Sequence, residues 1–257
     1  MPELIEVEYS RRLAEDLVGR RVATVELIDP HASAMSQASL EAALVGTVFG
    51  VPRRRGKLLL LDVESCTLGI HFGMTGRLVL DGRPAVERLL YAPVSLEPGW
   101  LRFRLGCRDG ATLELHDARR LARVFLDPAE AALGPDAASV TLAQLRDVLH
   151  GRRNALKARL LDQAALAGVG NLIADEVLWR TGLSPSRPAG SLNQQELSRL
   201  HRRLHSTIAL LLERGGSHTG DLMAARGRGG MCPLDGAPLD RTKVGGRTTY
   251  SCPLHQR

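Results

Sequence analysis

The sequence is poor in aromatic residues and contains no long hydrophobic run. Phe, Trp and Tyr make up only 4% of the 257 residues, and no segment approaches the roughly 18 consecutive apolar residues of a membrane-spanning helix. Charged residues occur throughout the N-terminal segment MPELIEVEYSRR, which does not resemble a signal peptide. Of only four cysteines, Cys66 and Cys107 lie in apolar, strand-like segments and are expected to be buried, reduced thiols. We therefore expect a cytoplasmic protein without a membrane partner.

Basic residues outnumber acidic ones, and this balance favours a polyanionic partner. Lys and Arg total 34 against 28 Asp and Glu, which gives a formal net charge of +6. Nucleic acid is the first candidate, although many basic enzymes bind none. The length and a hydrophobic content of 44% suit a globular protein with one large domain, or two ordinary domains and a small appended unit.

The last 26 residues contain two short pairs of potential metal ligands. Cys232 is followed three residues later by Asp235, and Cys252 is followed three residues later by His255. Gly245-Gly246 predicts the turn of a β-hairpin between the two pairs. Zinc binds four ligands in a tetrahedron, and two such pairs on a hairpin supply two each. Because the unit is too small for a core of its own, a bound metal would supply much of its folding free energy.

Asp235 is the least usual of these four ligands, because it stands where a second cysteine would complete the common set. Aspartate is a permitted zinc ligand, so a site of two cysteines, one histidine and one aspartate is possible. A metal-free hairpin held by packing is the alternative, and two unrelated thiols in a polar tail are the simplest interpretation. The zinc content of the pure protein distinguishes these hypotheses.

The first residues offer a nucleophile and two acids. Removal of the initiator methionine would expose the secondary amine of Pro2, which can attack an aldehyde-like carbon to form an iminium ion. The alternative is that Pro2 is an ordinary second residue. Residues 3–18 are predicted to form a helix, and Glu3 and Glu6 lie in its first turns. In the simple interpretation, these acids stabilise the start of the helix, because the helix dipole favours negative charge there. In the alternative, Glu3 or Glu6 acts as an acid or base beside the amine.

The hydrophobic pattern changes character near residue 127. Before it, short β-branched and apolar segments separated by turn residues predict an antiparallel sandwich or barrel-like domain of roughly 125 residues. After it, helical periodicity predicts helices over residues 141–149, 154–163, 171–181 and 193–214. Asn193 and Glu196 are spaced as a capping box for the last of these helices.

Three turns carry candidate anion-binding or DNA-binding residues. Lys57 ends a basic turn that begins at Arg53 and is most simply a solvated cationic loop. Met74 lies between two glycines, where an exposed apolar tip could wedge between bases, although a methionine there more often packs into a core. Gly168 and Gly170 precede a predicted helix, where backbone amides can approach a phosphate. An ordinary tight turn is the alternative there.

The motifs become specific through their order along the chain. The order is MPELIEVE, RRRGKLLLLD, HFGMTGRL, DARRLAR, AGVGNLIADEVLWRTGLSP and GGRTTYSCPLH. It resembles the formamidopyrimidine-DNA glycosylase and endonuclease VIII family of base-excision repair enzymes, over essentially the whole chain. The resemblance implies an α+β multidomain fold. The implied domains are an N-terminal catalytic β-sandwich with an opening helix (1–125), a helix–two-turn–helix DNA-binding domain (126–220) and a zinc-finger hairpin (221–257).

The resemblance also implies a bifunctional DNA glycosylase and abasic-site lyase, which removes oxidised bases and nicks the strand by β,δ-elimination. Pro2 matches the nucleophile that attacks C1′ and forms a Schiff base, and Glu3 matches the acid that protonates the sugar ring oxygen. Glu6 would help to place water or relay a proton. Lys57 matches a phosphate-binding lysine that assists the first elimination, and Arg247 matches a finger arginine that supports the second.

Further residues match positions that bind damaged double-stranded DNA in this family. Asn171 matches an asparagine that contacts phosphates beside the lesion. Met74, Arg119 and Leu121 match the three side chains that fill the gap left by the flipped base. The resemblance further implies a monomer in the bacterial cytoplasm, with one structural zinc ion on the two ligand pairs of the tail.

Four features depart from the family pattern and bear on substrate choice. Ile5 replaces a second proline, and Trp100 stands near the place of a DNA-contacting histidine. Leu121 replaces the phenylalanine usual in formamidopyrimidine members, and its smaller side chain cannot stack on a base. The 12 residues from Asp221 to Cys232 are fewer than the loop that caps an oxidised guanine in those members. We therefore expect oxidised pyrimidines, ring-opened purines or further-oxidised guanine to be preferred over 8-oxoguanine.

Two other functions compete with the enzyme hypothesis. A degenerate member would bind damaged or bent DNA without catalysis, but it should have lost the amine or its acid partner. Pro2, Glu3 and Lys57 are all present. An unrelated zinc-ribbon protein that binds RNA would need no function from the N-terminal motif. Borohydride trapping on an abasic site separates the enzyme from both alternatives.

Overall fold

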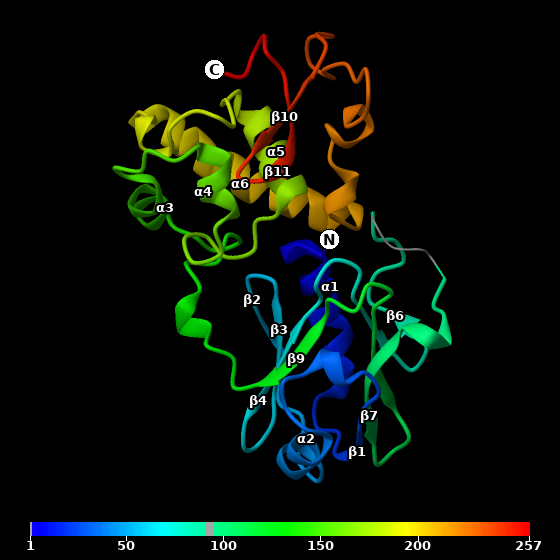
Figure 1. The fold of residues 1–257 in the computed structure, drawn as a ribbon. Coiled ribbons are helices and arrows are strands. Elements are labelled where there is room, and N and C mark those ends of the chain that lie inside the picture. Colours follow the sequence, from blue (N-terminus) through cyan, green and yellow to red (C-terminus); the bar gives the residue numbers. More distant parts are fainter. Residues whose placement is uncertain (1, 91–94) are drawn as a thin grey trace. The chain divides into compact units, whose positions relative to one another are not determined.

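A computed structural model describes residues 2–90 and 95–257 of the chain (Figure 1). The chain divides into two compact units, Met1–Glu130 and Ala131–Arg257. The described residues of the first unit form two antiparallel sheets and two α-helices, and the second unit holds four α-helices and a hairpin. The predicted α+β fold class is confirmed. The boundaries of the three expected domains remain predictions, and removal of the initiator methionine concerns a residue outside the described ones.

Two antiparallel sheets build the N-terminal unit, with the strand orders β1-β7-β8-β5-β6 and β2-β3-β4-β9. The strands of the first sheet are β1 (Val22–Leu27), β5 (Arg77–Leu80), β6 (Arg83–Pro84), β7 (Leu101–Cys107) and β8 (Thr112–His116). Those of the second sheet are β2 (Arg53–Arg55), β3 (Leu58–Asp62), β4 (Thr67–His71) and β9 (Arg123–Leu126). Alternate residues of both sheets, such as Phe103 and Leu105 of β7, fill one apolar core. The predicted antiparallel sandwich is therefore confirmed.

Helix α1 (Leu4–Ala14) opens the unit and contacts both sheets, through β3 and β5. A capping box starts the helix, because the Glu3 and Glu6 side chains each accept the other residue's backbone N–H. The predicted helix over residues 3–18 is shorter in the structure, since a 3-10 turn over Glu15–Leu17 follows Ala14. The capping box fixes Glu3 at the start of the helix, so residue 2 directly precedes the helix cap.

Helix α2 (Gln37–Leu44) packs Leu40 and Leu44 into the same core. Cys107 is buried at the end of β7, as predicted. Cys66 is only half-buried and precedes β4, so the prediction that it is a buried strand residue is wrong. The bend at Glu64 and Ser65 interrupts the apolar run, so Cys66 lies at the edge of the core and packs against it while partly exposed.

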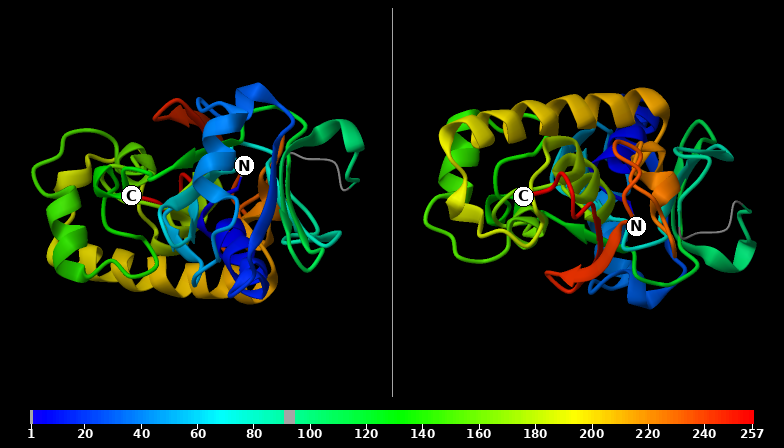
Figure 2. Two further views of the ribbon diagram at one scale, coloured as in Figure 1. Left: turned by 90° about the horizontal axis from the view of Figure 1, so that it is seen from below. Right: turned by 90° about the horizontal axis from the view of Figure 1, so that it is seen from above.

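Helices are the main regular elements of the C-terminal unit, and they lie close to the predicted positions. They are α3 (Leu142–Leu149), α4 (Leu156–Leu161), α5 (Asn171–Thr181) and α6 (Gln194–Arg214). Almost every residue of α5 is buried, whereas the long helix α6 is amphipathic and runs along one side of the unit (Figure 2). The predicted capping box of α6 is confirmed, because Asn193 and Glu196 each accept the other's backbone N–H at 2.9 Å.

The predicted hairpin is also present, with β10 (Asp240–Val244) paired to β11 (Arg247–Ser251). Gly245 and Gly246 both have positive φ, at 57° and 72°, which is the conformation of a type I′ turn. Strand β11 packs against α5, so the hairpin is attached to the most buried helix of its unit. Among residues 2–90 and 95–257, no helix is long and apolar enough to cross a lipid bilayer.

Candidate active site

The predicted nucleophile and acids lie together at the start of α1. Pro2 is buried, and the next residue, Glu3, is 1% exposed. The Glu3 backbone N–H donates to Glu6 Oε2 at 2.7 Å, and Glu6 is 3% exposed. Burying a carboxylate is unfavourable unless hydrogen bonds satisfy it, and the capping box supplies such bonds. Two enclosed carboxylates therefore adjoin residue 2, and they cap the helix as well.

A basic turn is fixed against the same helix. Lys57 lies in the turn between β2 and β3, and Gly56 there has φ 57°. Arg54 contacts Glu8 of α1 through Nε, 3.3 Å from Oε2, and donates from Nη1 to the Gly56 carbonyl at 2.9 Å. Burial raises the pKa of Glu8, but hydrogen bonds and charges from Arg11 and Arg54 lower it below its ordinary value overall. The turn that carries Lys57 is thus tied to α1 by a charged contact.

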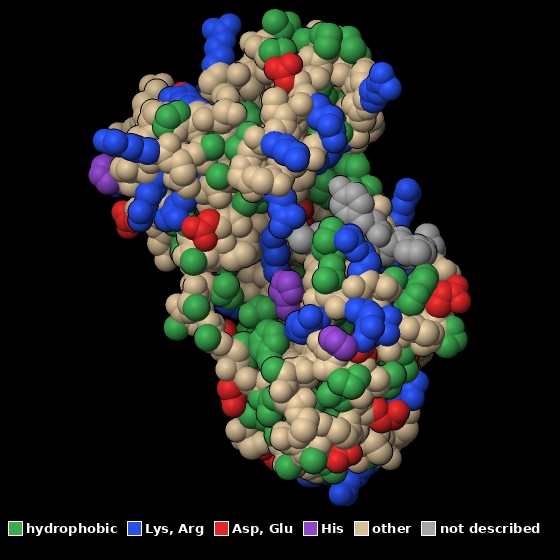
Figure 3. All heavy atoms as spheres, viewed as in Figure 1, with side chains coloured by type: hydrophobic (Ala, Val, Ile, Leu, Met, Phe, Trp, Pro, Cys, Tyr) green, Lys and Arg blue, Asp and Glu red, His purple; other side chains and the backbone are tan. Residues whose placement is uncertain are grey.

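Lys57 also belongs to a cationic group on the second sheet. Register pairs Leu58 of β3 with His71 of β4. Burial, and then the charges of Lys57 and Arg123, hold the pKa of His71 below its ordinary value. His71 Nδ1 accepts the Gly73 N–H at 3.2 Å, so the neutral imidazole supports the turn that follows β4. On the N-terminal unit, Lys, Arg and His side chains gather beside hydrophobic ones (Figure 3).

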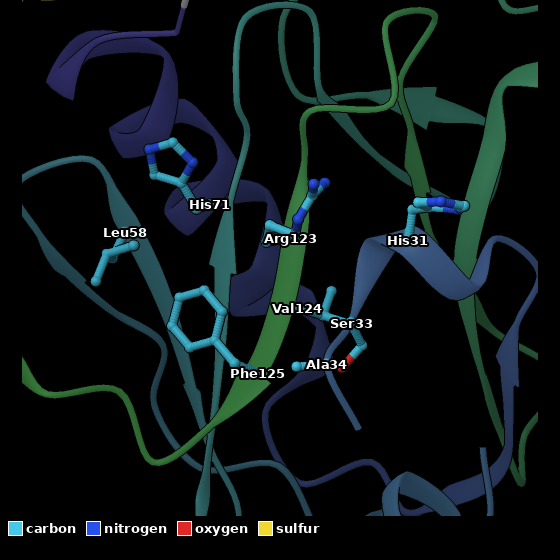
Figure 4. Close-up of a pocket in the computed structure, with 8 residues that line it drawn as sticks. All are labelled: His31, Ser33, Ala34, Leu58, His71, Arg123, Val124 and Phe125. Atoms are coloured by element: carbon cyan, nitrogen blue, oxygen red, sulfur yellow. The ribbon is translucent and has the colours of Figure 1, made fainter. Parts of the chain in front are cut away.

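A cavity of about 500 Å³ opens beside this cationic group (Figure 4). In Figure 4, His71 stands across the cavity from His31, and Phe125 lies below them. The lining residues are His31, Ser33, Ala34, Leu58, His71, Arg123, Val124 and Phe125. His71 lies within the motif HFGMTGRL, but no role was predicted for the histidine. Its position two residues before a predicted glycine turn was the signal that could have identified it.

The structure brings together the two loops that carry the predicted gap-filling residues. Met74 is half-buried on the turn after β4, and Arg119 and Leu121 are exposed on the loop between β8 and β9. A Cβ built on Gly73 would lie only 2.5 Å from the Leu121 carbonyl carbon. Gly73 has φ 57°, so both its conformation and this close approach require glycine. The backbones of the two loops that carry Met74, Arg119 and Leu121 therefore meet within the N-terminal unit.

In the C-terminal unit, Asn171 and Arg247 are held by neighbouring contacts. Asn171 begins α5, and its Nδ2 donates to the Thr248 carbonyl at 3.1 Å. Arg247 precedes Thr248 in β11 and is exposed. Gly168 and Gly170 are buried, and the Gly168 N–H already donates to Gln163 Oε1 at 2.9 Å. The glycine-rich turn leads into the start of α5, and Asn171 there is joined to β11, the strand that carries Arg247.

A buried ion network that the sequence analysis missed supports the same strand. Lys157 Nζ lies 2.6 Å from Asp175 Oδ1, and the two side chains are 0% and 1% exposed. Lys157 Nζ also donates to Thr249 Oγ1 at 2.8 Å and to the Thr248 carbonyl at 3.2 Å. Arg226 contacts the second carboxylate oxygen of Asp175. The network joins α4, α5, β11 and the segment before Cys232, but nothing in the local sequence pattern reveals it.

All four predicted metal ligands converge in the structure, with their ligand atoms within 4.8 Å of one another. Cys232 Sγ lies 3.7 Å from His255 Nδ1, Cys252 Sγ lies 3.2 Å from Asp235 Oδ2, and this oxygen lies 2.7 Å from His255 Nδ1. Zinc–ligand distances of about 2.0–2.3 Å in a tetrahedron require separations of roughly 3.3–3.8 Å. The cluster fits a zinc ion after a small expansion at Asp235. A site of two cysteines, one histidine and one aspartate is geometrically available.

Outer contacts orient these ligands. His255 Nε2 lies 3.2 Å from the Trp179 carbonyl, which turns Nδ1 toward the cluster. Trp179 Nε1 donates to Cys232 Sγ at 3.3 Å, and the Cys252 N–H donates to Gln256 Oε1 at 2.7 Å. The Ala237 N–H, and then His255, hold the pKa of Asp235 well below its ordinary value. The donor set therefore includes a carboxylate kept in its anionic, ligating form.

Comparisons with known proteins agree with this arrangement. Residues 1–124 match the model of the formamidopyrimidine-DNA glycosylase N-terminal domain, and residues 132–222 match that of its H2TH domain. The formamidopyrimidine-DNA glycosylase of Geotalea uraniireducens is 34% identical over 277 residues, which cover 98% of each chain. That of Thermus thermophilus is 36% identical over 285 residues, which cover 100% of this chain and 98% of the relative.

Solved structures extend the similarity to the fold. The Lactococcus lactis Fpg (MutM) complex with a FAPY-dG-containing DNA has a TM-score of 0.83 and 25% identity, and the match covers 99% of this chain and 100% of that one. A MutM complex with carbocyclic 8-oxo-G-containing DNA has a TM-score of 0.84 and 26% identity, with both chains fully covered.

Proposed function

The chain belongs to the formamidopyrimidine-DNA glycosylase family, and from this premise we propose a bifunctional DNA glycosylase and abasic-site lyase of base-excision repair. The observation that carries the proposal is the start of α1, where Pro2 is followed by the two buried carboxylates of Glu3 and Glu6. An amine and two carboxyl groups on one enclosed segment suit nucleophilic attack on a sugar carbon accompanied by proton transfer.

In this mechanism, removal of Met1 leaves Pro2 with a secondary amine. The amine nitrogen attacks C1′ of the damaged nucleotide, and the base leaves with the bonding electron pair and takes up the proton that the amine nitrogen releases. Glu3 donates a proton to the sugar ring oxygen, the ring opens, and an iminium ion joins Pro2 to the DNA. Glu6 relays a proton or places water. The amine must be neutral to attack, and in this proposal the positive charge of Lys57 favours the neutral form.

Strand cleavage follows from the iminium ion, which makes the hydrogen on C2′ acidic. Loss of that proton expels the 3′ phosphate, and a second elimination expels the 5′ phosphate. Lys57 and Arg247 neutralise these phosphates in the proposed mechanism. Asn171 assists by binding a phosphate oxygen, since its Nδ2 carries a second hydrogen besides the one donated to Thr248. The backbone at Gly170 supplies the positive end of the α5 dipole.

A base inside a duplex is out of reach of Pro2, so the nucleotide must leave the stack and its place must be filled. Met74, Arg119 and Leu121 fill it in the proposed mechanism, and the contact between their loops supports this role. The aliphatic side chain of Leu121 gives no stacking with the opposite base. We therefore propose weak discrimination of the opposite base.

The proposed substrates are oxidised pyrimidines and ring-opened purines, ahead of 8-oxoguanine. Support comes from the short segment Asp221–Cys232, which has 12 residues. Its structure is a single 3-10 turn, Met223–Ala225, with Arg226 held on Asp175. Little chain remains there to form an additional lid over a base. A clear preference for 8-oxoguanine paired with cytosine would reverse this assignment.

A zinc ion would be held by Cys232, Asp235, Cys252 and His255, which fit it in number, type and position. When bound, it supplies folding free energy to the hairpin rather than chemistry at the lesion. Arg247 and Thr248 lie on the strand that ends at this cluster. The cluster therefore positions a proposed phosphate-binding strand.

Borohydride trapping on an oligonucleotide with one abasic site tests the proposal. We expect a single covalent adduct that maps to the peptide beginning at Pro2. A variant with a short N-terminal extension blocks the amine and should form no adduct, whereas the same extension at the C-terminus should leave trapping unchanged. Binding of the DNA by the native protein without any adduct would identify a non-catalytic damage-binding protein instead.

A further inference from the structure

One buried carboxylate connects both loops that carry the gap-filling residues. Asp117 follows β8 and is 1% exposed. Its Oδ1 accepts a hydrogen bond from the Thr75 hydroxyl, on the turn that carries Met74. Its Oδ2 accepts the N–H groups of Leu121 and Ala122, at 2.6 and 2.7 Å. The same side chain thus binds the Met74 turn and the loop beyond β8.

Asp117 makes a further contact on the second loop and is itself held in place. The Arg119 N–H donates to Asp117 Oδ1 at 3.1 Å, so the carboxylate accepts hydrogen bonds from the backbone of both Arg119 and Leu121. The Asp117 N–H donates to the Trp100 carbonyl at 2.7 Å, and Arg102 Nε donates to the Asp117 carbonyl at 2.8 Å. Strand β7 therefore fixes the backbone from which this carboxylate projects.

The ends of the two loops have independent anchors. His71 Nδ1 accepts the N–H of Gly73, the residue before Met74, and this contact does not involve Asp117. Arg120 has a positive φ of 57°, which is unfavourable for a long side chain, and its guanidinium binds Asp29 at 2.7 and 2.8 Å. Asp29 is 5% exposed. This anchor ties the loop after β8 to the residues that follow β1.

We propose that Asp117 is a positioning residue that couples the Met74 turn to the Arg119–Leu121 loop, so that the three gap-filling side chains enter DNA as one preformed unit. This inference rests on the proposed function. A carboxylate can accept several hydrogen bonds at once, which no other small side chain does as well. Loops that are already ordered lose less conformational freedom on binding, so insertion and base extrusion are favoured.

The distinguishing substitution is Asp117→Asn, which keeps the shape but replaces one acceptor oxygen with an NH2 group. We expect base excision from duplex DNA to slow by about a hundredfold, as misplacement of a positioned group commonly does. Lyase activity on a single-stranded abasic oligonucleotide should remain unchanged, because no duplex needs to be opened. Fluorescence of 2-aminopurine opposite the lesion should report a loss of insertion.

Two matched variants separate coupling from general damage to the fold. Asp81→Asn alters another turn carboxylate of the same sheet, which accepts the Thr112 N–H at 2.7 Å, and should leave excision unchanged. Thr75→Val removes the hydroxyl that joins the Met74 turn to Asp117 and should reproduce the defect, whereas Thr75→Ser should restore duplex activity. The thermal midpoint of each variant is measured alongside.

A double-mutant cycle gives the decisive result. In a Met74→Ala/Arg119→Ala/Leu121→Ala background, Asp117→Asn should have little further effect, because the three side chains that it positions are gone. Additive losses, or an equal loss on single-stranded abasic DNA, would overturn the coupling. Failure of the native protein to form any borohydride adduct would instead reject the proposed function, so the two failures are distinguishable.

Discussion

In the N-terminal unit, the Lys57 and Met74 turns project from sheets that enclose a filled apolar core. In the C-terminal unit, Arg247 lies on a hairpin that has almost no apolar core. Both sheets and both helices of the first unit contribute to one buried cluster. In β10, four of five residues are exposed. The apolar cluster beside the hairpin consists of Trp179, Leu222, Cys232, Ala237 and Cys252. Hydrophobic burial thus positions the Lys57 and Met74 turns. Contacts of the ligand cluster and of the buried ion network position the hairpin that carries Arg247.

This difference means that the two units should respond differently to the same kinds of change. Apolar burial depends little on pH or on chelators. If the four potential metal ligands bind zinc as proposed, the hairpin should depend on each of them and on the buried ion network. The two regions can therefore be separated by experiments that remove the metal, one charge of the network, or one neutral imidazole.

Metal removal is expected to have the largest effect, and it should be confined to the hairpin. Structural zinc contributes about 10–16 kcal/mol to the folding of zinc-finger peptides. Chelation or Cys252→Ser should therefore unfold the segment after Cys232 and abolish the activity that depends on Arg247. Amide hydrogen exchange should show the loss in β10 and β11 while β3, β4 and β7 stay protected.

Cys66→Ser is the matched control for that experiment, because Cys66 is half-buried in the other unit and far from the ligand cluster in sequence. It should leave zinc content and exchange unchanged. Pure, active protein without metal but with a protected hairpin would show that packing alone holds it, and the comparison between the two units would fail.

Local sequence signals predicted much of this molecule. Gly245-Gly246 predicted the hairpin turn, Asn193 and Glu196 predicted a helix start, and the two ligand pairs predicted the cluster. Each signal lies within a few residues, so local geometry determines its outcome. The order of the family's motifs linked Met74 with Arg119 and Leu121, which lie some 45 positions later. Hydrophobic periodicity cannot detect such a link.

The missed features are long-range polar contacts. Asp117 binds Thr75 across 42 positions, and Lys157 binds Thr249 across 92. A buried Asp or Lys looks like any surface charge in the sequence, because only the folded chain reveals its partners. The opposite error occurred at Cys66, where an apolar run suggested full burial but a two-residue bend leaves the residue half-buried at the edge of the core.

The second expected effect comes from the buried ion network. Asp175→Leu leaves Lys157 and Arg226 without their shared carboxylate, and removing one partner of a buried pair typically costs about 3–5 kcal/mol. Urea unfolding should show this loss. The exposed pair of Arg53 and Asp62 offers the control, because Asp62→Asn should lower the free energy of unfolding by less than about 1 kcal/mol.

Replacing the charges together sharpens the same test. Lys157→Met combined with Asp175→Leu should recover part of the stability, since an apolar pair needs no compensation for burial. Arg226 is then free to reach solvent from the segment before Cys232. Equal destabilisation by Asp175→Leu and Asp62→Asn would mean that the network adds nothing beyond an ordinary surface pair.

The smallest expected effect concerns pH and the N-terminal unit. Burial and the charges of Lys57 and Arg123 lower the pKa of folded His71 below its ordinary value. The unfolded chain therefore binds this proton first as the pH falls below about 6.5. The free energy of unfolding should decrease below that pH, until the folded imidazole is protonated as well. His71→Gln removes this contribution, so the stability of that variant should vary less between pH 7.5 and about pH 5 in urea titrations.

Protonation of His71 also removes the acceptor of the Gly73 N–H, so the same pH change should weaken insertion by the Met74 turn. An identical pH dependence in His71→Gln and the native protein would mean that core packing alone holds that turn.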